Sequence, residues 1–425
     1  MEDNRQESAE SLLEKFVVYH DQQNYQKAKK VLEGALAIQT KDFGEDSVAV
    51  AATLYNLGIV LRDEGNLGQA IKKLNRALVI RLKKLGEKHA DTVETYRRIG
   101  WVLQEQDNDD QAEEMFQKAL DVQREVLPSD HPEVTELYQG LATSLKKQGK
   151  LSEAIKIHKL QLGALLQHGE VSPGVVLAYQ GIAELLALQK RLDDALQMLD
   201  RAIEICDQLR HLGELGGRLD IIFLGRTLHS KGEILKEQRN FEAATEVLKR
   251  LLMLQLERVG EMSPATAGTY ESLAQAYLEQ NMIEDAIKAS AKAINIRRRE
   301  LGIGHPHVKK LAVRLELLER DKNIIALNEE GLARHAEGDS KKAMQLYYQA
   351  IYIYKKTCTD SPSIGAVFES ISAIKVDQGL LEEAIAASAA ALKIRRRTQG
   401  DDHPDTKRRM EEHRSLLKRL LENRT

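Results

Sequence analysis

The sequence predicts an all-α solenoid of about nine helix pairs that ends in a C-terminal capping helix. Its composition favours helices, because the 425 residues include only 7 prolines and 4% aromatic residues, whereas strong helix formers such as Ala, Leu, Glu, Lys and Arg are abundant. The chain also repeats itself: the stretches that begin at Ala70, Ala112, Ala286 and Ala384 share one order of apolar, basic and small residues. Such an array packs each unit on its neighbours and has no single central core. We expect no β-strand.

The helix pairs are indicated by small residues at fixed spacing. A marker alanine recurs in every repeat, mostly at steps of 41 or 42 residues. The nine marker alanines are Ala28, Ala70, Ala112, Ala154, Ala195, Ala244, Ala286, Ala343 and Ala384. A second small residue usually follows seven positions later, and another usually precedes the marker by twelve. Small side chains at these spacings let two antiparallel helices pack closely, so each repeat is predicted to be a first helix, a tight turn and a second helix that carries the marker.

The predicted turn lies five residues before the marker. Four repeats have glycine there, where a left-handed cap would end the first helix: Gly65, Gly149, Gly338 and Gly379. Four others have Asp107, Lys190, Arg239 and Asn281. Asparagine can adopt the left-handed conformation, whereas aspartate, lysine and arginine predict a looser turn.

Two long steps interrupt the array. The extra residues before Ala244 surround Gly213, Gly216 and Gly217 and predict a lengthened loop. Residues 305–322 align with residues 403–420, and the latter are expected to form a helix that covers the last repeat. We therefore predict an N-terminal solenoid over residues 1–322, with about seven repeats and an internal capping helix that ends near Lys322, and a C-terminal solenoid over 323–425, with about two repeats and a capping helix. The alternative is one long helix over 306–336 in a continuous array.

The register of small residues resembles that of the tetratricopeptide repeat, whose small positions match Gly58, Ala70 and Ala77. The resemblance covers nearly the whole chain and implies a right-handed superhelical solenoid. The 42-residue period and its ALxIRxxxLGxxHPxV-like tail are similar to the repeats of kinesin light chains. Those proteins have an N-terminal coiled coil that binds the motor. Because the first repeat begins close to Met1, we do not expect a motor subunit.

The resemblance also implies a binding groove, because the first helices of this family line a concave face. Carried over by the small-residue register, the groove side chains include Tyr55, Asn56, Arg62, Arg97, Trp101, Gln104, Gln139 and Lys146. Asn56 alone matches the asparagine with which kinesin light chains hold a peptide backbone. Trp and Arg are frequent in interface hot spots. The alternative for Trp101 is packing between neighbouring helices.

The sequence contains no recognisable catalytic motif: no phosphate-binding loop, dinucleotide fingerprint, H-E-x-x-H or C-x-x-C occurs. The recurring His-Pro pairs at 131, 305 and 403 are expected to begin helices, because proline fits the first turn and the histidine fills the preceding loop. Two histidines without a third ligand make a poor zinc site. We therefore predict a protein that is not an enzyme and binds no metal or cofactor.

The expected location is the cytoplasm. Cys206 and Cys358 lie far apart and fit buried thiols in a reducing compartment. The residues after Met1 are acidic and polar, unlike a signal peptide, and no apolar run is long enough to cross a membrane.

Charge gives little guide to a partner, since the formal net charge is only −3. The triplets Arg297–Arg299 and Arg395–Arg397 occupy the same place in two repeats, at the end of the second helix, where positive charge complements the helix dipole. The same basic C-terminal end could contact acidic peptides or nucleic acid, or serve in nuclear import.

We expect a non-enzymatic scaffold or adaptor that binds a protein or peptide segment in its concave groove. The alternative is a cytoskeleton- or nucleic-acid-associated protein that uses the basic C-terminal region, with nucleic acid the less favoured ligand because the whole chain is not basic.

Overall fold

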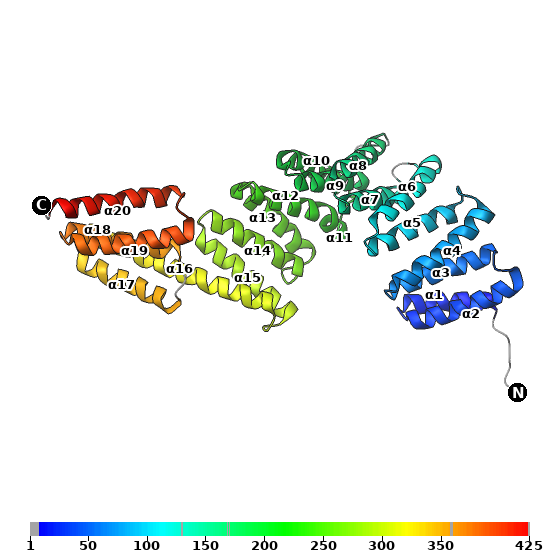
Figure 1. The fold of residues 1–425 in the computed structure, drawn as a ribbon, viewed down its shortest axis with the longest axis horizontal. Coiled ribbons are helices and arrows are strands. Elements are labelled where there is room, and N and C mark those ends of the chain that lie inside the picture. The colour runs from blue at the N-terminus through cyan, green and yellow to red at the C-terminus, as the bar shows by residue number, and fades with distance from the viewer. Residues whose placement is uncertain (1–7, 129–130, 168, 170, 358–359, 424–425) are drawn as a thin grey trace, which may run out of the picture. The chain divides into compact units, whose positions relative to one another are not determined.

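The computed structural model describes residues 8–128, 131–167, 169, 171–357 and 360–423. In these ranges all regular secondary structure is helical and no β-strand occurs, which confirms the predicted fold class (Figure 1). The contacts divide the chain into two compact units, Met1–Gln238 and Arg239–Thr425. We describe each unit separately.

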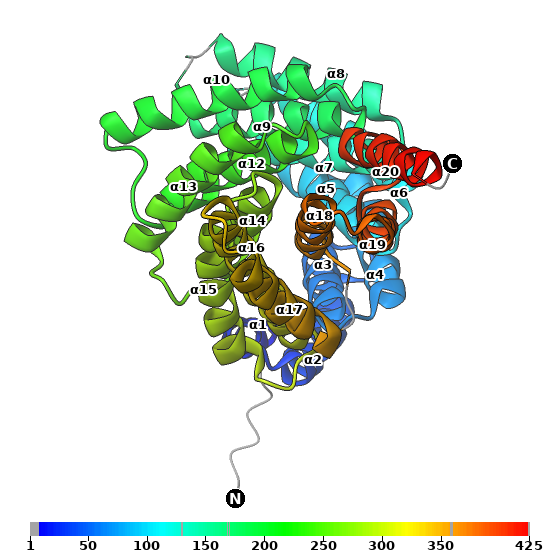
Figure 2. The same ribbon diagram turned by 90° about the vertical axis from the view of Figure 1, so that its left-hand side faces the viewer.

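The first unit consists of five complete helix pairs and a further first helix. The pairs are α1 (Ala9–Asp21) with α2 (Tyr25–Phe43), α3 (Val48–Asp63) with α4 (Leu67–Leu85), α5 (Ala90–Glu105) with α6 (Asp109–Val126), α7 (Pro132–Lys147) with α8 (Leu151–Leu166), and α9 (Pro173–Leu188) with α10 (Leu192–His211). A short helix α11 (Arg218–Asp220) and a π-helical turn (Ile221–Gly225) lead into α12 (Arg226–Glu237). Figure 2 shows α7 and α9 in a layer of first helices and α8 and α10 in a layer of second helices.

The second unit begins with α13 (Phe241–Arg258) and continues with three pairs. These are α14 (Pro264–Glu279) with α15 (Ile283–Leu301), α16 (Pro306–Ala336) with α17 (Ser340–Thr357), and α18 (Pro362–Asp377) with α19 (Leu381–Gln399). The last helix, α20 (Pro404–Glu422), packs on α19, as predicted for the capping helix.

The boundary between the units falls within the predicted sixth repeat, between α12 and α13. Lys322 instead lies inside the continuous helix α16, which is the arrangement weighed above as the alternative. The N-terminal half of α16 lies against α15, while Ile324 and Leu327 belong to the core formed with α17 and α18. One helix therefore joins two repeats, and a domain division at residue 322 stays a prediction.

The marker alanines organise the cores of both units, because all nine have no exposed surface. A bulky side chain usually follows four positions later and fills the space between helices. Leu74 lies against Gly58, and the Phe116 ring lies between Gly100 of α5 and Gly140 of α7. A β-carbon on either of those two glycines would lie 2.8 Å from the ring, so both positions require a glycine.

The prediction of looser turns without glycine is wrong. Asp107, Lys190 and Arg239 have φ values of 57°, 62° and 61°, close to the 80° of Gly65. The turn at Asp107 is closed by backbone hydrogen bonds from Asp107 to Gln104 and from Asn108 to Leu103, the same pattern as at Gly65. Packing of the helix pair fixes this geometry, although it costs a residue other than glycine about 1–2 kcal/mol.

The lengthened loop before α11 is confirmed, and Gly213 and Gly217 adopt φ values of 75° and 58°. Only part of the insertion forms loop, because α11 and the π-helical turn extend the next first helix backward. Cys206 is buried in α10, as expected, whereas Cys358 lies outside the described residues.

A polar side chain eleven residues after the marker links successive repeats, a feature that the sequence analysis missed. The Thr53 hydroxyl donates to the Gln39 side chain at 2.6 Å, and Thr269 donates to Gln255 at 2.8 Å. These contacts join a second helix to the next first helix through buried hydrogen bonds, which are stronger where water is excluded.

His158 and Gln161 place a polar pair in the core of the fourth repeat, where the second repeat has Leu74 and Ala77. The His158 Nδ1 donates to the Gln161 Oε1 at 3.1 Å. Burial lowers the pKa of His158, so the folded state favours the neutral ring. The first unit is therefore most stable, as far as His158 is concerned, above the unfolded-state pKa of about 6.5. Its free energy of unfolding decreases as the pH falls from there through the lower folded-state pKa.

We expect the double variant His158→Leu/Gln161→Ala to weaken the acid sensitivity of the first unit. Urea unfolding at neutral and mildly acidic pH, followed by the fluorescence of the single tryptophan, measures this sensitivity. The exposed His211→Gln is the control and should leave it unchanged. Equal losses of stability on acidification in the parent and the double variant would contradict the prediction.

Candidate functional site: the first-helix face

All eight predicted groove residues lie on three first helices of the first unit. Helix α3 carries Tyr55, Asn56 and Arg62, helix α5 carries Arg97, Trp101 and Gln104, and helix α7 carries Gln139 and Lys146. We call the surface formed by these residues the first-helix face. Helices α5 and α7 are in direct contact, and the side chains of α3 reach across to α5.

Charged side chains connect the helices of this face. The Tyr55 hydroxyl of α3 donates to Glu94 of α5 at 2.6 Å, and Arg97 contacts both Glu94 and Glu136 of α7. Lys146 of α7 contacts Glu184 of α9 at 2.8 Å. Burial and then the hydrogen bond to Glu94 raise the pKa of Tyr55, so the phenol remains a donor at neutral pH. The face is therefore a row of paired charges rather than a patch of one sign.

Arg62 lies toward the preceding repeat. Its guanidinium contacts Asp63 at 2.7 Å, and the same carboxylate is 3.0 Å from His20 of α1. The side chain of Arg62 is about one quarter exposed, at 24%, so part of the guanidinium can still reach a ligand.

Gln104 is the buried member of the first-helix face and joins two helices. Its amide nitrogen donates to the Gly140 carbonyl at 2.7 Å and to the Ser144 hydroxyl at 2.6 Å. Gln180 of α9, at a different position of its repeat, donates in the same way to a carbonyl and to a hydroxyl four residues further on, those of Phe223 and Thr227. Because the Gln104 side chain is buried, its observed contacts are those of a cross-link between helices.

Trp101 is half-buried at the centre of the face. Its ring packs edge-on against Phe116, with centroids 5.0 Å apart and planes at 72°. One edge thus contributes to packing, which was the alternative weighed for this residue, while part of the ring remains at the surface. Asn56 and Gln139 are also half-buried.

Sequence reasoning missed the acidic members of the face. Each predicted base or hydroxyl pairs with a carboxylate in the adjacent repeat or beside it: Asp63, Glu94, Glu136 and Glu184. Tyr55 and Glu94 are separated by 39 residues, as are Arg97 and Glu136. A spacing of 39 residues, which is three fewer than the 42-residue repeat, would therefore have predicted these partners.

The recurring histidines cap helices, as the His-Pro pairs predicted. The Nδ1 atoms of His131, His305 and His403 each accept a hydrogen bond from the backbone N–H two residues later, at 3.2–3.3 Å, with proline in the first turn. His89 forms the same cap without proline. The described residues contain no group of three side chains arranged to hold a metal ion. In the same ranges no helix is long and apolar enough to span a lipid bilayer.

The arginine triplets have a structural component, as the repeat interpretation predicted. Arg297 contacts Glu271 at 2.9 Å. Arg395 and Glu369, each 98 residues further along the chain, form the equivalent pair. Each contact joins the second helix of a repeat to its own first helix. The first arginine of each triplet is thus part of the fold.

Comparisons with known proteins agree with this architecture. One family model described as a tetratricopeptide repeat matches residues 7–81, 50–125, 91–160 and 133–208, and a second with that description matches 266–307 and 368–405. Together these matches span about two thirds of the chain. No curated protein matches the chain.

Similar solved structures include the following three chains. The nearly identical TPR-like repeats assigned to a kinesin light chain of Podosopora anserina share 20% identity with this chain, cover 48% of it and 95% of their own length, and give a TM-score of 0.44. BtubC (BKLC) from P. vanneervenii shares 19% identity over 58% of this chain and 93% of its own, with a TM-score of 0.46. A tetratricopeptide repeat protein from Parabacteroides merdae shares 16% identity with this chain, covering 73% of this chain and 98% of its own length, with a TM-score of 0.45.

Proposed function

Because the chain belongs to the tetratricopeptide-repeat family, we propose that it is a non-enzymatic cytoplasmic scaffold or adaptor that binds a segment of a partner protein on the first-helix face. The observation that supports this proposal most directly is the row of partly exposed side chains on α3, α5 and α7, with Trp101 at its centre. Aromatic and arginine side chains in such a position supply most of the binding energy in many interfaces.

The pairing of charges limits the kind of ligand that this face can hold. Arg97 is held between Glu94 and Glu136, so a purely acidic ligand would have to displace two carboxylates. A segment that carries both signs around an apolar anchor can instead insert into the row and keep each charge paired. Since such a segment must also be ordered on binding, we expect an affinity on the order of micromolar.

The triple variant Arg62→Ala/Arg97→Ala/Trp101→Ala is expected to lose its groove-bound partners. Affinity capture from cytosol with the intact protein and the variant, followed by mass spectrometry, identifies the proteins that depend on the face. Loss of one of three hot-spot contacts typically costs more than about 1 kcal/mol, so the combined variant should weaken binding by well over tenfold. Titration of the purified partner then measures this change.

The matched control is Arg76→Ala/Leu160→Ala/Arg201→Ala, which removes two arginines and one apolar side chain from exposed positions of second helices. Both triple variants must melt at the temperature of the parent. If the first one does not, Arg62→Gln/Arg97→Gln/Trp101→Phe keeps the packing on Phe116 and tests the same surface. Partners that remain bound to every variant would place the interaction elsewhere and contradict the proposal.

A further inference from the structure

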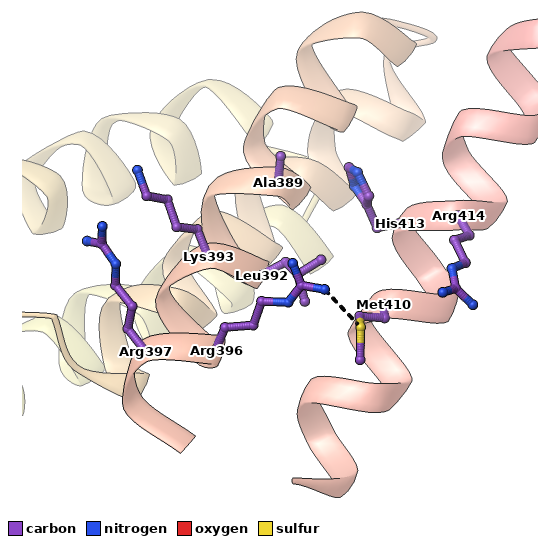
Figure 3. Close-up of a pocket in the computed structure, with 8 residues that line it drawn as sticks. All are labelled: Ala389, Leu392, Lys393, Arg396, Arg397, Met410, His413 and Arg414. Carbon is purple, nitrogen blue, oxygen red and sulfur yellow. Dashed lines mark hydrogen bonds between the residues drawn. The ribbon is translucent and has the colours of Figure 1, made fainter. Parts of the chain in front are cut away.

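A basic cleft lies between α19 and α20 in the second unit, away from the first-helix face in the sequence. Its volume is about 540 Å³, and it is lined by Ala389, Leu392, Lys393, Arg396, Arg397, Met410, His413 and Arg414. Figure 3 shows Lys393, Arg396 and Arg397 arising from α19 and Arg414 from α20, with Arg396 directed toward α20. Four of the eight lining residues are cationic, one is an imidazole and none is acidic.

The cleft keeps its positive charge exposed. Arg396 contacts Asp401 at 3.0 Å and Arg397 contacts Asp360 at 3.1 Å, yet their side chains remain 49% and 60% exposed. Within the part of the chain that the structure describes, no salt bridge holds Lys393 or Arg414. Exposed cations that are only partly neutralised attract anionic groups over the screening distance of about 10 Å.

The repeat itself does not require this charge. The equivalent positions 98 residues earlier keep two arginines, Arg298 and Arg299. In the later copy, however, Lys393 replaces Asn295, His413 replaces Leu315 and Arg414 replaces Glu316. The three differences change the lining from a net charge of +1 to +4, counting histidine as neutral. The cleft therefore has a basic character beyond that of the arginine triplet at the helix end.

Contacts inside the cleft organise its rim around an apolar floor. The Arg396 guanidinium donates to the Met410 sulfur at 3.3 Å (Figure 3). The His413 Nδ1 lies 3.1 Å from the Ser388 hydroxyl. Leu392 is buried beneath them. An apolar side chain of a ligand can lie on Leu392, Ala389 and Met410 while carboxylates reach the surrounding cations.

We propose that the α19–α20 cleft binds an acidic segment of a partner protein, with carboxylates on Lys393, Arg396 and Arg414 and an apolar side chain on the floor. Guanidinium groups hold carboxylates through paired hydrogen bonds, and a lysine adds a point charge. A nucleic acid fits less well, because the lining offers no Trp, Tyr or Phe for base stacking. This site is independent of the first-helix face.

The test is fluorescence anisotropy of the full chain with a labelled synthetic peptide in which Asp and Glu flank a leucine. The variant Lys393→Asn/His413→Leu/Arg414→Glu carries the residues that the chain already has at the equivalent earlier positions. It should weaken binding at least about tenfold, and binding by the parent should weaken as salt is raised. The control Lys309→Asn/Lys310→Glu makes the same net-charge change on α16, at two exposed positions, and should bind like the parent.

Four results would overturn the proposal. The parent does not bind the peptide, or the triple variant Lys393→Asn/His413→Leu/Arg414→Glu (the transplanted variant) binds it as tightly as the parent. The control loses as much affinity as the transplanted variant, or the parent binds a single-stranded oligonucleotide more tightly than the peptide. Circular dichroism and thermal melting establish that each variant is folded. Should the transplanted variant unfold, the exposed single changes Lys393→Asn and Arg414→Gln test the same cations, and unchanged binding by both would be equally decisive. None of these outcomes depends on whether the first-helix face binds a partner.

Discussion

Replacing Phe116 with alanine is expected to lower the free energy of unfolding of the first unit by about 3–5 kcal/mol, the typical cost of removing a fully buried aromatic side chain. The ring has no exposed surface and fills the space between Gly100 and Gly140, so three helices lose a common contact when it is removed. Neither glycine can fill the space, and the Trp101 ring loses its edge-on partner. Urea unfolding followed by the fluorescence of Trp101 reports this unit alone, because it contains the single tryptophan.

The control for this change is Phe116→Leu. Leucine occupies the same position in other repeats, at Leu32, Leu74, Leu199 and Leu248, and it keeps most of the apolar volume, so Phe116→Leu should cost clearly less than Phe116→Ala. Similar losses in both variants would indicate that ring volume is not what the site requires, and a loss below about 1 kcal/mol in the alanine variant would show that the helices collapse into the space.

Replacing Glu369 with alanine is expected to destabilise the second unit by about 2–4 kcal/mol, because breaking a largely buried ion pair leaves its partner uncompensated. Glu369 accepts from Arg395 at 3.2 Å and contacts Arg409 at 2.8 Å, so one carboxylate joins α18 to α19 and α20. The side chains of Arg395 and Glu369 are only 10% and 13% exposed. The hydrogen bond to Glu369 raises the pKa of Arg395. Because arginine stays charged at neutral pH even without such a partner, removing the carboxylate leaves a largely buried charge without its counterion. Hydrogen exchange of α18 and α19, read by mass spectrometry, measures the loss.

The earlier copy of this cluster provides a matched comparison. Glu271 contacts Arg297 and His307, but its side chain is 23% exposed and Arg297 has a second partner in Glu300. Glu271→Ala should therefore cost less than Glu369→Ala, and Glu369→Gln should fall between the parent and Glu369→Ala because it keeps a hydrogen-bond acceptor. A larger loss at Glu271 than at Glu369 would show that burial does not govern the contribution of these pairs.

Much of the fold could be predicted from the sequence, because each repeat carries its own small-residue pattern. The marker alanines are buried, the helix pairs occur where the spacing places them, and α20 covers α19. The turns at Asp107 and Lys190 were predicted wrongly, since intrinsic preference disfavours a left-handed residue that packing of the pair imposes. The long helix α16 was weighed only as an alternative: its first half resembles a terminal cap, but no glycine or proline interrupts residues 307–330, so the helix continues.

Less of the binding surface could be predicted. The register places Tyr55, Arg97 and Trp101 on adjacent first helices, but it cannot show which polar groups already have partners. Glu94 and Glu136 come from neighbouring repeats, and their contacts depend on how far each repeat is offset along the next. Gln104 shows the same limit, because a side chain at a surface register position is drawn inward by the Gly140 carbonyl. The α19–α20 cleft depends on pairing between the last repeat and its cap, which no single repeat encodes.

The continuity of α16 has a consequence for cooperativity within the second unit. In a simple array, neighbouring repeats interact only through an interface, so one repeat can open while the next stays folded. Here the seventh and eighth repeats share the single helix α16. Within it, Ile324 lies about two helical turns before Gly331, and Gly331 packs against the Tyr347 ring. Opening of α16 near its middle would remove its contacts with α15 and with the core of α17 and α18 together. We therefore expect the two repeats that share this helix to unfold together as one cooperative unit.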